Sequence, residues 1–141
     1  MDPLSVAASI AGLITLTELI VSRGYEFVKG VKNAKTEVTQ LLSELTALFG
    51  VLQSLRLVAL RFEGEHFDTT LQLECLQNCQ KLVEQIHAQL RIALPEDSDG
   101  RWRAVGKSLK WPLSNAETKI LIESTARHKA TLSLALNADG L

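Results

Sequence analysis

The chain has 141 residues, of which 46% are hydrophobic, 22% are charged and only 5% are aromatic. This length and composition indicate one globular domain that buries a core without needing disulfides or metals. The formal net charge of −1 argues against a strongly basic nucleic-acid-binding protein.

The first predicted element is unusually apolar. The sequence opens with MDPLSVAASIAGLITLTELIVS, in which Glu18 is the one charged side chain between Pro3 and Val21. Asp2 followed by Pro3 is a good helix start, because the carboxylate accepts hydrogen bonds from the first free N–H groups and proline has none to satisfy. We predict a helix to about Ser22. It is apolar on every side, as is typical of a helix buried in protein or in lipid, and the acidic second residue argues against a secretory signal.

Downstream of a bend or short helical link over 24–30, residues 33–62 give the clearest helical signal. Their apolar side chains recur in alternating steps of three and four, which indicates a helix packed against neighbouring helices at a shallow angle. The repeat consists of Val38, Leu41, Leu45, Leu48, Leu52, Leu55, Ala59 and Phe62. A third helix is predicted over 67–94, ended by Pro95.

The fourth predicted helix begins at a capping box, in which the side chains of Ser114 and Glu117 each accept a hydrogen bond from the other residue's backbone N–H. It runs to about Asn137. Residues 96–100 predict a turn, and 101–113 an irregular or briefly helical link. Because no segment alternates as a strand does, we predict an all-α fold: a four- to five-helix bundle with an apolar N-terminal helix, forming a single domain over 1–141.

No set of residues indicates catalysis, a metal or a cofactor. His66, His87 and His128 fall on three different predicted elements, and the glycines do not form a phosphate-binding loop. Cys75 and Cys79 lie four residues apart on one helix face, a spacing too wide for a relaxed disulfide. We interpret them as small buried hydrophobes in a reducing compartment and predict that the protein is not an enzyme.

One local cluster of positive charge stands out near the link before the fourth helix. Cations beside tryptophans suit an anionic membrane surface, although the same pattern binds nucleic acid through stacking and phosphate contacts. Alternatively, both tryptophans plug one end of the bundle and the charges are simply solvated. The cluster consists of Arg101, Trp102, Arg103, Lys107, Lys110 and Trp111.

Two blocks of sequence resemble the fungal HeLo-like N-terminal domain. They are MDPLSVAASIAGLITL at the start and LKWPLSNAETKILIESTARHKATLSLALNAD over 109–139. That family precedes NACHT-type and ankyrin-repeat STAND receptors (NLR-like proteins of innate immunity and heterokaryon incompatibility) and occurs in small effectors of programmed cell death. It is similar to the HeLo domain of HET-S and the four-helix bundle of MLKL. Since the chain stops soon after the second block, we expect a domain excised from a longer protein.

The resemblance implies a cytoplasmic bundle that oligomerises at the plasma membrane and permeabilises it, triggered by an attached or cognate STAND receptor or by an amyloid-forming segment. Its first helix is then the inserting element, and residues 3–21 would span about 28 Å of a hydrocarbon core about 30 Å thick. The residues expected to enter lipid are Leu4, Val6, Ile10, Leu13, Ile14, Leu16, Leu19 and Ile20.

A second set in the same helix is small or polar and is expected to make helix–helix contacts in lipid or to line a lumen. It consists of Ser5, Ala8, Ser9, Gly12 and Glu18. The basic cluster supplies the headgroup candidates for anionic lipids. In the resting state we expect the first helix to be the central core helix, with its small residues packed against its neighbours.

The alternative function is an oligomerising protein–protein interaction (adaptor) module of a STAND-type receptor without membrane activity. The two readings would be distinguished by charged substitutions at Ile10 or Leu13, if these abolish lipid binding while the bundle remains folded. A nucleic-acid-binding role is third, and would require salt-sensitive DNA binding that is lost with the cations of 101–111.

Overall fold

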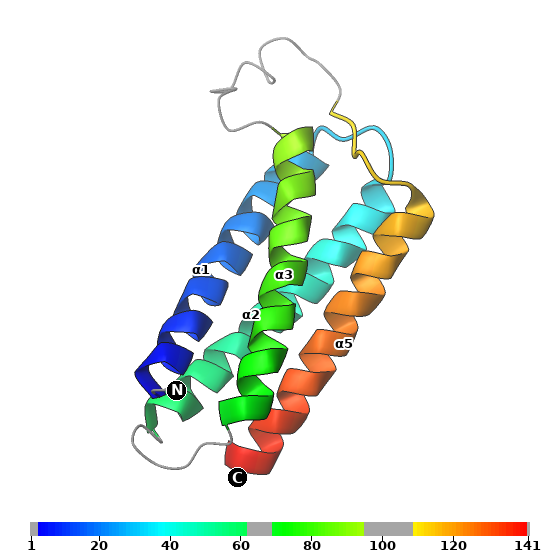
Figure 1. The fold of residues 1–141 in the computed structure, drawn as a ribbon. Helices are drawn as coiled ribbons and strands as arrows, with labels where there is room; N and C mark the ends of the chain where they lie inside the picture. The colour runs from blue at the N-terminus through cyan, green and yellow to red at the C-terminus, as the bar shows by residue number, and fades with distance from the viewer. Residues whose placement is uncertain (1–2, 62–68, 95–108, 141) are drawn as a thin grey trace.

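The computed structural model describes residues 3–61, 69–94 and 109–140. The helices within these residues are α1 (Pro3–Val28), α2 (Lys35–Arg61), α3 (Thr69–Ala93) and α5 (Asn115–Gly140). They run alternately up and down in a four-helix bundle, with both ends of the chain at one pole and the α1–α2 link at the other (Figure 1). The predicted all-α bundle with an apolar N-terminal helix is confirmed.

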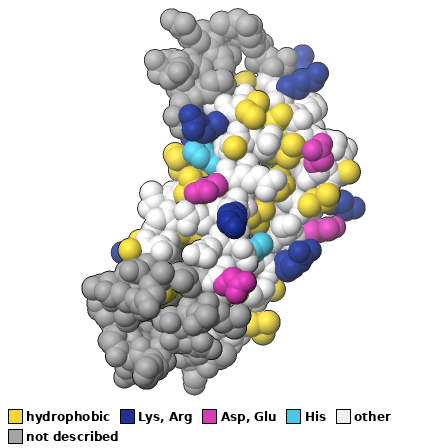
Figure 2. All heavy atoms as spheres, viewed as in Figure 1, with side chains coloured by type: hydrophobic (Ala, Val, Ile, Leu, Met, Phe, Trp, Pro, Cys, Tyr) yellow, Lys and Arg dark blue, Asp and Glu magenta, His cyan; other side chains and the backbone are white. Residues whose placement is uncertain are grey.

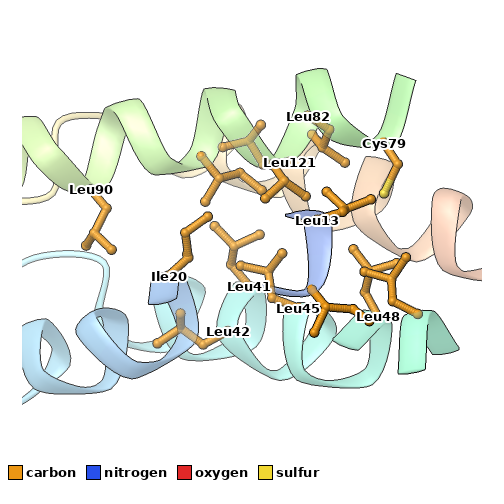
Figure 3. Packing of buried hydrophobic residues seen from close by; sticks show 14 of the residues in the cluster. Leu13, Ile20, Leu41, Leu42, Leu45, Leu48, Cys79, Leu82, Leu90 and Leu121 are labelled. Atoms are coloured by element: carbon orange, nitrogen blue, oxygen red, sulfur yellow. The ribbon is translucent and has the colours of Figure 1, made fainter. Parts of the chain in front are cut away.

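The four helices lie at the corners of a square, and none of them is surrounded by the other three. In order around the bundle they are α1, α2, α5 and α3, so that each helix packs against two others, and α2 has the more extensive contacts. The expectation that the first helix is central is therefore wrong: α1 occupies one corner and keeps an outward face. The core between the helices is aliphatic, with Leu13, Leu45, Leu82 and Leu121 contributed by the four helices in turn (Figure 3).

Of the two predictions for 24–30, the bend is wrong and helical structure is found, because α1 continues without a break to Val28. Its buried positions recur in alternating steps of four and three, and this seam continues past Gly24. Burial along such a seam outweighs the cost of about 1 kcal/mol of one helical glycine. The seam consists of Val6, Ile10, Leu13, Thr17, Ile20, Gly24, Phe27 and Val31. Its one hydroxyl, on Thr17, donates to the Leu13 carbonyl at 2.7 Å.

A short segment before α5 is tied to the α1–α2 link by paired hydrogen bonds. The backbone N–H of Lys32 donates to the Leu109 carbonyl at 3.1 Å, and that of Leu109 donates to the Gly30 carbonyl at 3.2 Å. The Asn33 amide adds two bonds to the backbone of Trp111: its Nδ2 donates to the carbonyl at 3.1 Å, and its Oδ1 accepts from the N–H at 2.9 Å. We call these four hydrogen bonds the clasp.

The capping box that predicted the last helix is present. The Ser114 N–H donates to Glu117 Oε1 at 3.2 Å, and the Glu117 N–H donates to Ser114 Oγ at 3.1 Å. These bonds satisfy N–H groups that have no partner within the helix, which fixes where α5 begins. The helix then runs to Gly140, slightly beyond the predicted end.

Candidate membrane-interaction site

Most side chains of the predicted insertion set lie in the core of the bundle. Val6, Ile10, Leu13, Ile14 and Ile20 are buried, Leu16 is half-buried and Leu19 is 41% exposed, while the side chain of Leu4 lies outside the described residues. In this conformation the set stabilises the fold, and it reaches lipid only if α1 leaves its neighbours. Charged substitutions at Ile10 or Leu13 would therefore unfold the bundle. A substitution that distinguishes membrane activity from an interaction module has to be made at an exposed position instead.

The small residues of α1 that were predicted to make helix–helix contacts lie on its outward face instead of in the core. Ala8, Ser9 and Gly12 are exposed, which corrects the expectation that they pack against neighbouring helices; the side chain of Ser5 lies outside the described residues. The bulky seam residues occupy the inward face of α1, so the small residues are left outside. With Leu13, Leu16 and Gln80 they line an open hollow of about 340 Å³ between α1 and α3.

The outward surfaces of the middle parts of α1 and α2 together carry almost no charge. From Ala8 to Ser22 the exposed residues of α1 include a single ionisable group, Glu18, and from Thr39 to Ser54 the exposed residues of α2 include none. We call this surface the neutral face. It consists of Ala8, Ser9, Gly12, Thr15, Glu18, Leu19, Ser22, Thr39, Gln40, Ser43, Thr46, Ala47, Gly50, Gln53 and Ser54.

The exposed surfaces of α3 and α5, by contrast, are rich in both signs of charge. These residues are Glu74, Lys81, Glu84, Arg91, Glu117, Lys119, Glu123 and Arg127. Since soluble domains usually carry mixed charge over their whole surface, the neutral face is an unusual half of this molecule. The sequence contains part of its signal, because Glu44 is the one charged residue between Val38 and Leu55 of the second helix, but only the first helix was singled out there.

Two helices of the described part are long and apolar enough to cross a membrane. They cover Val6–Val28, with a mean hydropathy of 1.5, and Lys35–Arg61, with 1.4. Core helices of soluble proteins meet the same criterion, and a third of each stretch is buried here. The sequence pattern singled out the first stretch as a possible membrane span, but not the second. Within α2, Glu44 is held by Lys129 of α5, whose Nζ lies 3.0 Å from Oε2.

The residues predicted to bind lipid headgroups do not share one environment in the structure. Lys110 is exposed, whereas Trp111 is 4% exposed and packs on Phe27 with ring centroids 5.9 Å apart. The indole N–H of Trp111 donates to Thr118 Oγ1 at 2.8 Å. This tryptophan therefore plugs the bundle end, as the alternative interpretation proposed, and in this conformation it does not face lipid. The other four candidates, Arg101, Trp102, Arg103 and Lys107, lie outside the described residues.

The cysteines behave as the sequence indicated. Both are free thiols, with Cys79 buried and Cys75 half-buried. Burial, with a smaller contribution from the charge of Cys75, raises the pKa of the Cys79 thiol from 9.0 to about 12. Cys75 and His128 line a hollow of about 140 Å³ between α3 and α5. Among the described residues, no group of three or more His, Cys, Asp or Glu side chains is placed to hold a metal.

Fold and surface together define a small helical-bundle domain with one neutral and one charged half. The chain belongs to the family described as the N-terminal domain of pigment biosynthesis cluster protein PigL, whose model matches residues 1–138. This family is grouped with the HeLo-like domains, so the resemblance seen in the sequence is confirmed at that level.

One curated relative is a much longer protein than this chain. The chain is 22% identical over 144 residues to the azaphilone pigments biosynthesis cluster protein L of Monascus ruber, an alignment that covers 98% of this chain and 30% of that protein. The chain thus spans less than a third of the length of the curated relative it matches. No solved structure matches it.

Proposed function

We propose that this domain targets and permeabilises membranes, acting as the cell-killing module of a longer protein, and that α1 inserts into lipid when copies assemble. The observation that carries the proposal is the neutral face. It lets residues 8–22 of α1 and 39–54 of α2 meet lipid, or another copy, with one exposed charge, Glu18. The HeLo-like grouping of the family supports the same function. The proposal entails a non-enzymatic, cytoplasmic domain that moves to the plasma membrane on activation.

Simple energetics indicate that insertion has to be coupled to assembly. Residues 3–21 contain nine Leu, Ile and Val side chains, which favour insertion by roughly 3–5 kcal/mol. The free energy of unfolding of a domain is typically about 5–15 kcal/mol. Removing α1 from this bundle would expose its core. One helix alone therefore gains too little from lipid to leave the bundle, whereas contacts between inserted copies supply the additional driving force.

Two glycines on the neutral face support self-association. Gly12 and Gly50 are exposed in the middle of helices, and a Cβ at either position would meet no atom within 4 Å. Each glycine costs roughly 0.5–1 kcal/mol of helix stability relative to alanine, and no contact inside the chain requires it. Close approach by a helix of a second copy would give both glycines a role, because small residues let helix backbones come together.

The test is dye release from vesicles containing phosphatidylserine, with copies clustered by a C-terminal inducible dimeriser. We expect the 141-residue chain to release dye and Leu19→Glu to reduce release at least tenfold. Leu134→Glu, on the charged half and 70% exposed, is the matched control and should leak like the parent. Far-UV circular dichroism checks that all three remain helical. Equal leakage by both variants would contradict the role of the neutral face.

The second candidate function is an oligomerising interaction module that never enters lipid, and the neutral face also favours this reading. It predicts concentration-dependent oligomers in sedimentation experiments, disrupted by Leu19→Glu, with neither vesicle binding nor leakage after clustering. That combination of results would replace the membrane proposal.

A further inference from the structure

Basic side chains gather at the end of the bundle where α1 stops. Those in and beside the α1–α2 link, and Lys110 beside the clasp, are exposed, and Arg91 lies in the last turn of α3 at the same end (Figure 1). Figure 2 shows dark-blue Lys and Arg side chains at this end of the molecule. We call the cluster the basic pole; it consists of the exposed Lys29, Lys32, Lys35, Arg91 and Lys110, and of the half-buried Arg23, whose Nη2 donates to the Leu94 carbonyl at 3.4 Å.

Acidic residues offset this charge only in part. The described acids at this end are Glu26, Glu37 and Glu117, half as many as the cations. Glu26 lies 3.7 Å from Lys29, and Glu117 is engaged in the capping box. The remaining excess of positive charge faces solvent along the end of the bundle, next to the neutral face but distinct from it.

The connectivity of the chain relates this pole to α1. The clasp holds Gly30, Lys32 and Asn33 against the segment before α5, so the link stays attached to the rest of the bundle if α1 moves. A lysine at the centre of a bilayer is strongly unfavourable. The N-terminus of α1 lies at the opposite pole in this conformation, so an inserting α1 has to pivot about the link; its N-terminus then enters the bilayer while the lysines of the link stay in the near headgroup layer.

We propose that the basic pole is a docking surface for anionic lipid headgroups, so that the bundle stands end-on on the membrane with the last turn of α1 at the lipid surface. This inference rests on the proposed function and names the partner and orientation that it requires. The tryptophan-containing cluster expected from the sequence contributes only Lys110 to this surface among the described residues. The lysines of the α1–α2 link were not singled out in the sequence.

The test is sedimentation of the 141-residue chain with vesicles of phosphatidylserine and phosphatidylcholine, or of phosphatidylcholine alone. The pole variant carries Lys29→Gln, Lys32→Gln and Lys35→Gln. Each lysine near an anionic surface is worth about fivefold in partitioning, so the variant should bind the anionic vesicles about 100-fold more weakly. The control variant, with Arg56→Gln, Arg61→Gln and Lys81→Gln, removes the same net charge elsewhere and should bind like the parent.

Equal weakening by the pole and control variants would overturn the docking surface, since only net charge would then matter. Tight binding of a DNA duplex that is lost with the same lysines would assign the pole to nucleic acid instead, and would also overturn it. Dye release measured on the same vesicles separates the two proposals. Leakage that is indifferent to the pole lysines refutes the docking surface alone, whereas a chain that neither binds nor leaks refutes both.

Discussion

Substitution by alanine is predicted to change the stability of the bundle differently at three helical glycines that look alike in the sequence. Gly12 and Gly50 face open space, whereas at Gly24 a Cβ would overlap Cδ2 of Leu42 and lie 3.2 Å from its Cγ. At the two exposed positions the change removes only the conformational cost of glycine. We expect Gly12→Ala and Gly50→Ala each to raise the free energy of unfolding by about 0.5–1 kcal/mol.

At Gly24 the same gain in helix propensity meets a packing penalty. Leu42 is 2% exposed, so its side chain has no room to retreat without displacing the core. Overpacking of this kind costs about 1–3 kcal/mol. We therefore expect Gly24→Ala to be neutral to destabilising by about 2 kcal/mol, and to be less stable than Gly12→Ala by about 1–3 kcal/mol.

Urea unfolding followed by far-UV circular dichroism measures these differences. The double variant Gly24→Ala with Leu42→Ala provides the internal check: since it removes the overlap, the two substitutions should be coupled favourably. If Gly24→Ala stabilised the chain as much as Gly12→Ala, Leu42 would have moved without cost. The close approach of α1 and α2 would then not be the reason for this glycine.

Three further predictions concern the clasp, the helix cap and the buried thiol. Asn33→Ala should lower the free energy of unfolding in urea by about 1–3 kcal/mol, because it leaves the N–H and carbonyl of Trp111 unpaired; a loss no larger than at an exposed asparagine of α3 would contradict the clasp. Ser114→Ala should cost about 1 kcal/mol in the same assay, and no change would mean that the cap is dispensable. The raised pKa of Cys79 predicts that stability falls by about 1.4 kcal/mol per pH unit as the pH rises from 9.0 toward about 12, because the unfolded thiol ionises there and the folded one does not. A Cys79→Ala variant should lose that slope, and iodoacetamide should label Cys75 before Cys79 unless the chain is unfolded.

The extent of α2 and the start of α5 followed from local rules, whereas the end of α1 did not. The 3–4 repeat placed α2 within two residues at its start, and the capping box placed the start of α5, because both signals depend on residues about one turn apart. Of the candidate site, the sequence identified the apolar first helix and the lone charge of Glu18. It did not show which side of that helix faces inward, since apolar and small residues surround it entirely.

The sequence by itself determined the fold class, the extent of α2, the start of α5 and the scarcity of charge in the first 22 residues. Only the tertiary structure decided that Gly12 is outside and Gly24 inside, that Trp111 is a core residue, and that the neutral face continues onto α2. The physical reason is that helical periodicity is set within a few residues of chain, whereas burial depends on which neighbour covers a face. For a helix without a polar side, that choice is made by the shape of the seam between α1 and α2, where Leu42 packs against Gly24.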